Sequence, residues 1–377
     1  MIIKGEKLNL KATYCRDCPR GIHTLMNTLD AGVCEANIGK EASTSESKKE
    51  VSMAQRFFFM TAVFFVGLVA ILSGQTLAAD NFPNRPITLV YGYPAGGVAG
   101  NTARAVATGA EKALGQPLVL LCKPGAAGTI AVDFVVDSKP DGYTLLSAHT
   151  GTLVYAMYNE GVKFRPKDFT PILGYTIANF AYVCPVNAPW KNYDEWVAYV
   201  RSHPGFKYGT YGALGALHVL MEWIAKKENI KLTPVHFKGD APGITALLGG
   251  HVMMHGAAGS HGPQIKAGKL RTLLQVTGIP SDPDPKSVPL LADKYPDCPR
   301  EFYYLPFGVY GPKGIPEDIY RKLIAAFRAG AQDPSCQQAL STMNMSVELF
   351  EPEKLKKEME KGYVEYGKLI KGLGLER

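Results

Sequence analysis

A glycine-broken loop between a strand-like run and a helix-like run is the first stretch of this sequence that could hold a ligand. Residues 91–107 read YGYPAGGVAGNTARAVA, with Gly96, Gly97 and Gly100 ahead of an alanine-rich segment. The first amides of a helix have no partners within it and carry the positive end of its dipole. The loop therefore predicts an anion site, with which phosphate, nucleotide and carboxylate are all compatible.

The glycine pattern can be compared directly with two nucleotide-binding loops. A dinucleotide fingerprint needs G-x-G-x-x-G, whereas this chain has G-G-x-x-G. A phosphate-binding P-loop needs G-K-[ST], and the chain has Gly100, Asn101 and Thr102 there. Neither pattern fits, and the loop alone could equally be a turn that joins a strand to a helix. The rest of the chain must decide.

Other stretches resemble catalytic or metal sites without completing one. Ser260 lies beside His261, but an alanine stands where a nucleophile elbow needs its first glycine. His251 and His255 are spaced H-V-M-M-H, without the glutamate of the zinc-protease pattern. Cys122 has no basic pair near it in the sequence to activate a thiol. We therefore expect no catalysis, metal or cofactor, and keep a serine hydrolase that uses Ser260 only as an alternative.

Strand-like and helix-like runs alternate through most of the chain after residue 80. This alternation is typical of an α/β protein in which helices flank mostly parallel sheets. Two extended segments, residues 179–190 and 301–312, read as crossings between two lobes. We predict that residues 80–182 and 305–377 form the first lobe and residues 183–304 the second. Such a chain forms a hinged cleft between its lobes.

The first eighty residues have a different character. From Met53 the chain reads MAQRFFFMTAVFFVGLVAILSGQTLAAD, in which an arginine precedes an apolar run and small residues follow it. This order predicts a secretory signal peptide over residues 53–79 and a periplasmic mature protein of a Gram-negative bacterium. The apolar run is shorter than the roughly 20 residues that a membrane-spanning helix needs. Because a signal peptide begins a chain, we interpret residues 1–52 as a spurious extension from a start codon assigned too early.

The charge of the chain bears on the kind of ligand that it binds, and its cysteines bear on possible disulfides. The chain has 41 Lys and Arg against 34 Asp and Glu, and its fractions of hydrophobic and charged residues, 46% and 20%, are those of a globular protein. The mild basic excess favours a small anion over nucleic acid, which needs a concentrated basic stripe. In an oxidising compartment one or two disulfides could form, and the sequence does not choose the pairing. The cysteines after the leader are Cys122, Cys184, Cys298 and Cys336.

A series of stretches in fixed order resembles one protein family. They are RPITLV with PAGG, KPGAAGTIA, PDGYTLL, HTGT, HPGFKYGTYGALGALH, VHFKGDAPGITALLGGHV and IKAGKLRTL. From about Phe82 to the C-terminus the chain is similar to the substrate-binding proteins of tripartite tricarboxylate transporters, the Bug family. The resemblance implies a monomeric two-lobed periplasmic binding protein of Venus flytrap architecture, without a cofactor. Such a protein holds a small di-, tri- or aromatic carboxylate and delivers it to integral-membrane permease subunits.

The resemblance also implies which residues bind the carboxylate. Tyr93 matches the aromatic residue before the glycine loop, and further loops of both lobes match the loops that contact the ligand in the family. In that family backbone amides, hydroxyls and ordered waters hold the carboxylate. The implied ligand-binding residues are Tyr93, Ala95, Gly96, Gly97, His149, Thr150, Thr152, Thr210, Tyr211, Gly212, Ala213, Ala258 and Ser260.

Some positions depart from the family pattern. Gly100 stands where Asp is common, Tyr211 where Ser is common, and His149 where a small or hydroxyl residue is common. The two larger groups argue against the shortest dicarboxylates, so a wider, partly aromatic ligand becomes an alternative. Tyr93 could instead pack in the core, and His149 could be a satisfied loop histidine. A sensor partner that presents its ligand to a membrane receptor would have the same cleft, so it is the alternative to transport.

The stretch KGDAPGITALLGG has a structural explanation. We predict that Asp240 caps a helix, that Pro242 lies in its first turn, and that Gly249 and Gly250 end it. This role needs no ligand.

Overall fold

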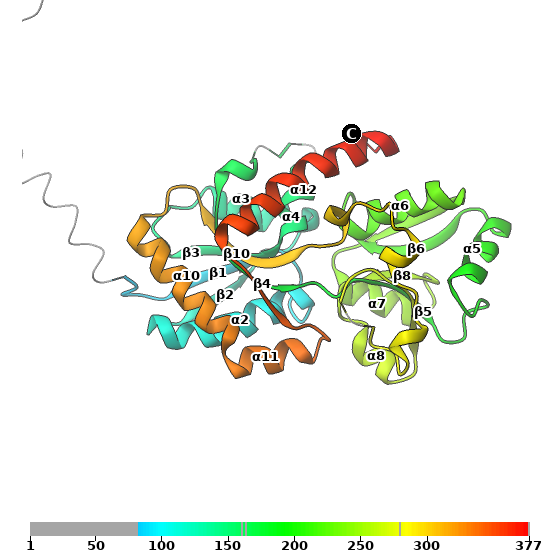
Figure 1. Cartoon of the computed structure of the whole chain (residues 1–377), viewed down its shortest axis with the longest axis horizontal. Coiled ribbons are helices and arrows are strands. Elements are labelled where there is room, and N and C mark those ends of the chain that lie inside the picture. The colour runs from blue at the N-terminus through cyan, green and yellow to red at the C-terminus, as the bar shows by residue number, and fades with distance from the viewer. Residues whose placement is uncertain (1–81, 160, 163, 279, 376–377) are drawn as a thin grey trace, which may run out of the picture. The chain divides into compact units, whose positions relative to one another are not determined.

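Two β-sheets, each flanked by helices, make up the part of the chain that the computed structural model describes (Figure 1). The described residues are 82–159, 161–162, 164–278 and 280–375, and they belong to one unit of the chain. The predicted signal peptide and the segment before it lie outside them. We refer to the first sheet with its helices as lobe 1 and to the second as lobe 2.

The strands are short and follow one another with a helix between most of them. The first sheet has six strands in the order β11-β4-β10-β3-β1-β2, and the second has five in the order β7-β6-β8-β5-β9. Lobe 1 contains β1 (Ile87–Tyr91), β2 (Leu118–Cys122), β3 (Thr144–His149), β4 (Phe169–Ile177), β10 (Pro306–Pro312) and β11 (Val347–Phe350). Lobe 2 contains β5 (Ala181–Pro185), β6 (Phe206–Tyr211), β7 (Leu232–Phe237), β8 (His255–Ala257) and β9 (Leu270–Gln275).

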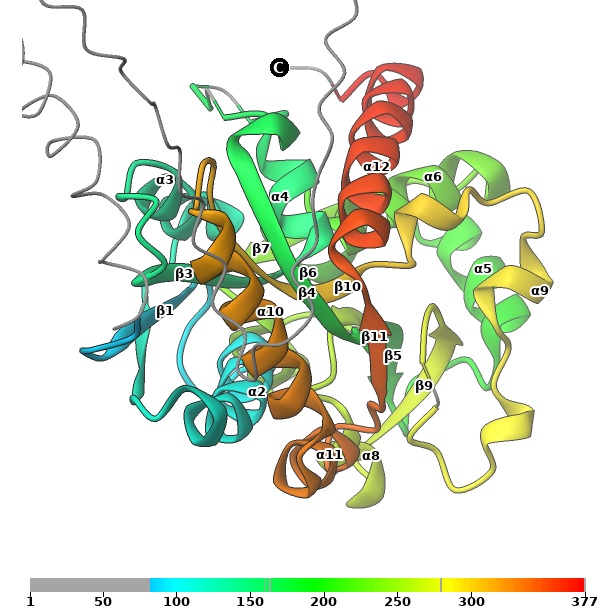
Figure 2. The ribbon, with the colours of Figure 1, turned by 60° about the vertical axis from the view of Figure 1, so that its left-hand side comes forward.

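Helices cover both faces of the first sheet. α2 packs against α10 and α11 below the sheet in Figures 1 and 2, whereas α12 packs against α4 above it. The helices of lobe 1 are α2 (Val98–Leu114), α3 (Thr129–Val136), α4 (Thr150–Ala156), α10 (Glu317–Gln332), α11 (Pro334–Ser341) and α12 (Pro352–Leu373). Those between β5 and β10 are α5 (Tyr193–Ser202), α6 (Ala216–Glu228), α7 (Asp240–Leu248), α8 (Gly262–Lys266) and α9 (Leu291–Lys294).

The two-lobed α/β fold predicted from the sequence is confirmed, but the strand pairing is more mixed than the predicted mostly parallel sheets. β1 pairs in parallel with β2 and β3, and β6 with β7 and β8. β10 runs antiparallel to β3 and β4, and β5 antiparallel to β8 and β9. β5 and β10 lie within the two segments predicted as crossings. They enter their sheets from the other lobe and run away from the cleft, opposite to β3 and β4 in lobe 1 and to β8 and β9 in lobe 2.

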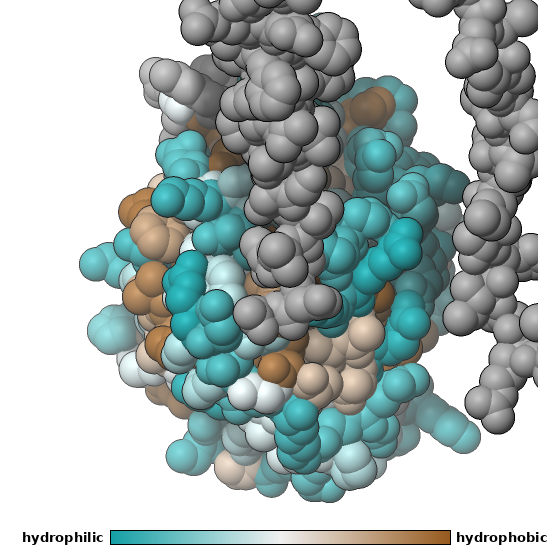
Figure 3. Space-filling view, turned by 90° about the vertical axis from the view of Figure 1, so that its left-hand side faces the viewer, coloured by the Kyte–Doolittle hydropathy of each residue, from teal (hydrophilic) through white to brown (hydrophobic). Residues whose placement is uncertain are grey.

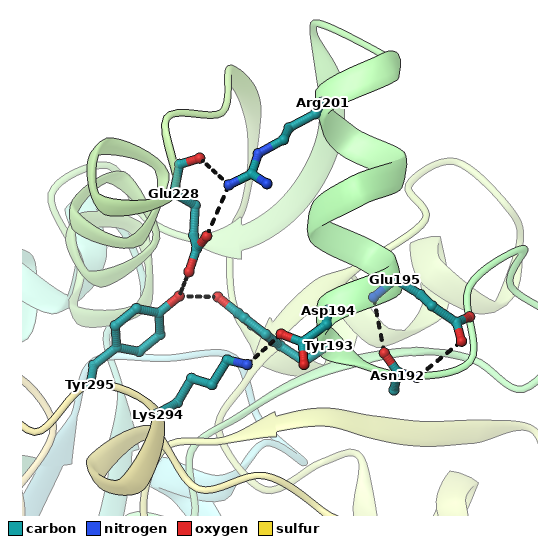
Figure 4. Close-up of polar contacts among 8 residues, drawn as sticks. All are labelled: Asn192, Tyr193, Asp194, Glu195, Arg201, Glu228, Lys294 and Tyr295. Atoms are coloured by element: carbon teal, nitrogen blue, oxygen red, sulfur yellow. Dashed lines mark hydrogen bonds and ion pairs between the residues drawn. The ribbon is translucent and has the colours of Figure 1, made fainter.

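A polar network joins the helices of lobe 2 far from the cleft (Figure 4). The hydroxyls of Tyr193 and Tyr295 lie 2.6 Å apart, and Tyr295 also donates to the carboxylate of Glu228 at the end of α6. Arg201 at the end of α5 donates to the backbone oxygen of Glu228 at 2.9 Å and to its carboxylate at 3.3 Å. These contacts hold α5, α6 and the segment after α9 together, and so fix the helices that flank the second sheet.

The surface and the cysteines fit a globular protein. The coloured part of Figure 3 is mostly hydrophilic, with scattered hydrophobic residues. In the described ranges no helix has the length and apolar character needed to cross a membrane. The cysteines that the sequence left open to disulfide pairing are free, with Cys184, Cys298 and Cys336 buried and Cys122 half-buried.

Helices α2 and α10 cross where two glycines meet, which yields a stability prediction. A Cβ on Gly109 would lie 2.6 Å from the backbone oxygen of Gly330. We expect Gly109→Ala to force the helices apart and to lower the free energy of unfolding by about 1–3 kcal/mol, measured by urea denaturation. Gly372→Ala in α12 is the matched control, because a Cβ there meets nothing within 4 Å. It should raise stability by up to about 1 kcal/mol. Equal stabilities of the two variants would contradict this helix contact.

Candidate functional site

Loops from both lobes meet at the carboxyl ends of strands. In lobe 1 they follow β1 and β3, which are parallel, and in lobe 2 they follow β6, β7 and β8, which are also parallel. Ligands of open α/β sheets bind outside the carboxyl ends of such strands. The fold therefore brings together backbone segments that are more than a hundred residues apart in the chain.

An inner cavity of about 30 Å³ lies between the lobes, with walls from both. A cavity of this size has room for little more than one or two water molecules, so the lobes are closed on each other. Lobe 1 contributes Tyr93, Pro94, Gly97, Val98, Ala99, His149 and Phe307, and lobe 2 contributes Tyr211, Gly239, Asp240, Ala241, Pro242 and Ala258.

An outer cavity of about 630 Å³ adjoins the inner one and shares Tyr93 and Pro94 with it. Its wall includes an exposed cation, Lys238, at the end of β7. Together the two cavities give a narrow inner space and a wide outer one along one cleft. The other residues lining the outer cavity are Pro124, Gly125, Ala126, Ala127, Asn159, Gly212, Ala213, His236 and Phe237.

Glycines of lobe 2 allow its backbone to touch lobe 1. A Cβ on Gly212 would lie 2.7 Å from the Cβ of Ala127, and one on Gly259 would lie 2.9 Å from Cγ2 of Val98. Both glycines have positive φ, +83° and +117°, which side chains rarely adopt. Larger residues at these positions would hold the cleft further open.

Several helices begin at the cleft without a side-chain cap. The N-cap residues of α2, α6 and α7 are Gly97, Gly215 and Gly239, and none of them has a capping side chain. Each helix start thus presents amides that lack an intrahelical acceptor. Gly97 and Gly239 line the inner cavity from opposite lobes. The arrangement suits an anion that accepts hydrogen bonds from backbone amides.

His149 is the exception, because it caps its own helix. The amide of Thr152 donates to Nδ1 of His149 at 3.1 Å, and Nε2 of His149 lies 2.9 Å from the Thr152 hydroxyl. Nδ1 is therefore the acceptor and Nε2 carries the proton. The Thr152 hydroxyl lies 3.3 Å from the hydroxyl of Tyr93, which donates to the backbone oxygen of Ala127 at 2.9 Å. A directed chain of hydrogen bonds runs from His149 to Ala127.

Burial keeps both rings of this chain neutral. Burial lowers the pKa of His149 to about 3 and raises the pKa of Tyr93 to about 12. With both ring nitrogens engaged, His149 presents only its carbon edge and face to the cavity. It is a structural histidine that borders the site, the alternative that the sequence had left open.

Tyr211 lines the inner cavity and has a buried hydroxyl without a partner among the described residues. Its side chain is 5% exposed. The rings of Tyr211 and Tyr93 meet edge to face with their centroids 6.0 Å apart. Burial raises the pKa of Tyr211 well above its ordinary value. It therefore stays a hydrogen-bond donor at any physiological pH.

Asp240 does not cap α7, which corrects the prediction made for it. The N-cap is Gly239, and the Asp240 carboxylate turns instead to β8 and the loop after it. Its Oδ2 accepts from the Ser260 amide at 2.8 Å, and Oδ1 lies 3.3 Å from Nε2 of His255. Burial acts to raise the pKa of Asp240, but the hydrogen bonds with His255 and Ser260 outweigh it and hold the pKa below its ordinary value. The predicted first-turn Pro242 is where the sequence placed it.

Only some of the residues that the resemblance assigns to the ligand line the two cavities. Thr150 turns away, because its hydroxyl lies 3.1 Å from both the Pro306 backbone oxygen and the Tyr310 hydroxyl. Ala95 and Gly96 are exposed, and the buried hydroxyl of Thr210 has no partner among the described residues. Those that line the inner cavity are Tyr93, Gly97, His149, Tyr211 and Ala258, and Gly212 and Ala213 line the outer one.

Some lining residues that the prediction did not include belong to glycine-containing stretches already quoted from the sequence. Asp240, Ala241 and Pro242 belong to the stretch KGDAPG, and Ala126 and Ala127 to KPGAAG. Both stretches follow a predicted strand and contain glycine, the same signal that identified the first loop.

The hydrolase and metal patterns find no geometric support. Neither ring nitrogen of His261 has a hydrogen-bond partner among the described residues, so it does not act on the neighbouring Ser260. In the part of the chain that the structure describes, no group of three or more His, Cys, Asp or Glu side chains could hold a metal ion.

Comparison with known proteins identifies the family. The family profile of the tripartite tricarboxylate transporter family receptor, TctC, matches residues 102–375. The chain belongs to this family. The family is one of periplasmic solute-binding proteins. The resemblance inferred from the sequence motifs is confirmed.

Relatives and solved structures agree with that assignment. A UPF0065 protein encoded in the gbd 5' region of Cupriavidus necator is 36% identical over 270 residues, which cover 71% of this chain and 81% of the relative. The structure of the periplasmic binding protein BugD superposes with a TM-score of 0.71 at 25% identity and covers 78% of this chain and 99% of that one. MatC of Rhodopseudomonas palustris, solved with bound malate, has the same fold at 24% identity, with a TM-score of 0.68 and coverage of 77% and 100%.

The buried His149 predicts a specific pH dependence of stability. Because its pKa is about 3 in the folded protein, the unfolded chain alone takes up a proton as the pH falls below about 6.5. His149 therefore stabilises the fold above that pH, and the contribution is lost progressively toward pH 3. His149→Asn keeps a capping acceptor but does not titrate. Between pH 7.5 and pH 5, urea denaturation should show the wild type losing about 2 kcal/mol more than the variant. Equal losses would contradict a neutral His149.

Proposed function

We propose that this protein captures a small organic carboxylate between its lobes and delivers it to the permease subunits of a tripartite tricarboxylate transporter. The observation that carries the proposal is the pairing of the uncapped start of α2 at Gly97 with the unpartnered Tyr211 hydroxyl across one closed cavity. Both groups donate hydrogen bonds, and they come from opposite lobes. A carboxylate that accepts from both would stabilise the closed state.

The energetics favour such a ligand. A hydrogen bond to a charged group contributes about 1.5–3 kcal/mol, and a buried hydroxyl left without a partner costs a similar amount. In the ligand-bound protein Tyr211 would gain that partner. The dipole of α2, a helix of 17 residues, adds a favourable field for an anion at its start.

The shape of the cleft supports a ligand longer than its carboxylate. The inner cavity lies where the polar end of a ligand would bind, whereas the outer cavity of about 630 Å³ has room for the rest of the molecule. The rings of Tyr211 and His149 narrow the inner space, so a wider ligand would extend outward past Tyr93. MatC, which has this fold, was solved with malate, a dicarboxylate. The candidate ligands to be screened for this chain are mono-, di-, tri- and aromatic carboxylates.

Family membership supports delivery to a permease, since the matching family is described as a receptor of the tripartite tricarboxylate transporter family. The proposal includes export through the predicted signal peptide, residues 53–79, and a monomer in the periplasm. A sensor partner of a membrane receptor would use the same cleft. Co-purification with permease subunits from membranes would support transport, whereas capture by a receptor kinase would support sensing.

Substitution of Gly97 tests the binding site. Aspartate is a favoured N-cap residue, and Gly97 has an ordinary φ of −82°, so Gly97→Asp should fold normally. Its carboxylate would occupy the α2 amides and repel an incoming anion. With the best ligand from a thermal-shift screen of carboxylates and neutral analogues, calorimetry should show affinity reduced by about a hundredfold or more. Gly97→Asn, a neutral cap of the same shape, should retain more affinity. If Gly97→Asp bound the ligand with undiminished affinity, the loop would be only a turn between β1 and α2 and not part of the binding site.

Tyr211 offers a second test with a matched control. Tyr211→Phe removes a hydroxyl that has no partner among the described residues, so stability should hold while affinity for the screened ligand falls by about tenfold. Tyr182→Phe removes a buried hydroxyl of lobe 2 that donates to the backbone oxygen of Leu217 at 2.7 Å. It should lower the thermal midpoint and leave affinity unchanged. Calorimetry and thermal unfolding of both variants distinguish ligand binding from packing, and the reverse pattern would exclude Tyr211 from the site.

A further inference from the structure

The amide of Ser260, a residue that the resemblance assigns to the ligand, already has a hydrogen-bond acceptor within the protein. Ser260 follows β8, and its amide donates to Oδ2 of Asp240 at 2.8 Å. Asp240 starts α7 and lines the inner cavity, in which Ala258 of the same loop also lies. The protein thus supplies its own carboxylate to an amide at the lobe 2 end of the site.

The carboxylate of Asp240 is buried and held by hydrogen bonds in the wall of the inner cavity. Asp240 is 8% exposed, and both of its oxygens are held, one by the Ser260 amide and the other near Nε2 of His255 at 3.3 Å. His255 is itself fully buried, so the Asp240 carboxylate is held against a fixed partner in the wall of the inner cavity.

Asp240 also sets the charge of the inner cavity. Among the described residues that line it, Asp240 is the one with an acidic side chain, and none is Lys or Arg. The cation Lys238 lines the outer cavity instead. Both walls contain an uncapped helix start, at Gly97 in lobe 1 and at Gly239 in lobe 2, but only the lobe 2 wall adds a negative side chain, that of Asp240.

We propose that Asp240 selects a monocarboxylate that also carries a hydrogen-bond donor, such as an ammonium, hydroxyl or amide N–H group, and excludes a second carboxylate from the inner cavity. The inference rests on the proposed function and narrows its ligand class. The ligand's carboxylate lies at the start of α2, and its donor group meets the oxygen atoms of Asp240.

The physical basis is the cost of unbalanced buried charge. Two carboxylates that share a water-poor site cannot both stay ionised without a large penalty, as the pKa shifts of paired acids show. A donor at the same place gains a charge-assisted hydrogen bond instead. A dicarboxylate of the same length would need to send its second carboxylate outward toward Lys238.

Matched ligand pairs test the assignment. Each pair consists of a dicarboxylate and its half-amide, which have nearly the same shape: succinate with succinamate, glutarate with glutaramate, and phthalate with phthalamate. Calorimetry on the full mature protein should show the half-amide of a binding pair favoured by about tenfold or more. In Asp240→Asn the preference should shrink to about threefold or less, because the amide still accepts from Ser260 but carries no charge.

A control separates this effect from a general change in charge. Asp282 of lobe 2 accepts from the Thr272 amide at 3.0 Å and does not line the inner cavity, so Asp282→Asn should keep the wild-type preference. Circular dichroism and thermal unfolding verify that both variants fold. The assignment would be overturned if the wild type bound both members of a pair equally or bound the dicarboxylate more tightly. It would also be overturned if Asp240→Asn kept the wild-type preference. In each of these cases carboxylate binding itself would stand. If neither these probes nor any carboxylate of the wider screen binds the wild type, the proposed function fails with it.

Discussion

The approach of backbone to backbone across the cleft is the constraint on which this site depends. In the proposed function a carboxylate accepts hydrogen bonds from both lobes, so the two walls must approach each other closely where they meet. Gly212 and Gly259 bring lobe 2 against Ala127 and Val98. The glycine start of α2 and the hydroxyl of Tyr211 are useful for binding only because the walls approach this closely.

Much of the fold could be predicted from the sequence, because strand and helix periodicity is local. The alternation predicted successive strands and helices, and the helix start near Gly97 was visible as a glycine loop. The direction of β5 and β10 was not visible, since antiparallel pairing is decided by the side from which a strand enters its sheet. No pattern within a single strand records that.

The site was predicted in part for a similar reason. The role of Asp240 depends on Ser260, twenty residues later in sequence, and on the closed geometry of β8, so helix-cap chemistry was the natural but wrong interpretation. His149 differs, because its partner Thr152 lies one turn further along α4. A histidine three residues before a threonine at a helix start carries a local signal for capping. The lining residues that only the fold could bring together, such as Phe307 beside Gly97, had no such signal.

The order of strands in the two sheets has a consequence for how the chain assembles. β4 does not pair with β3, because β10 lies between them, so the first sheet stays divided until residues 306–312 are in place. The strands of the second sheet all come from one continuous segment that ends at Gln275. Lobe 2 can therefore complete its pairing as an independent local event. Lobe 1 must close a loop that contains the whole of lobe 2, at the entropic cost that long-range contacts carry.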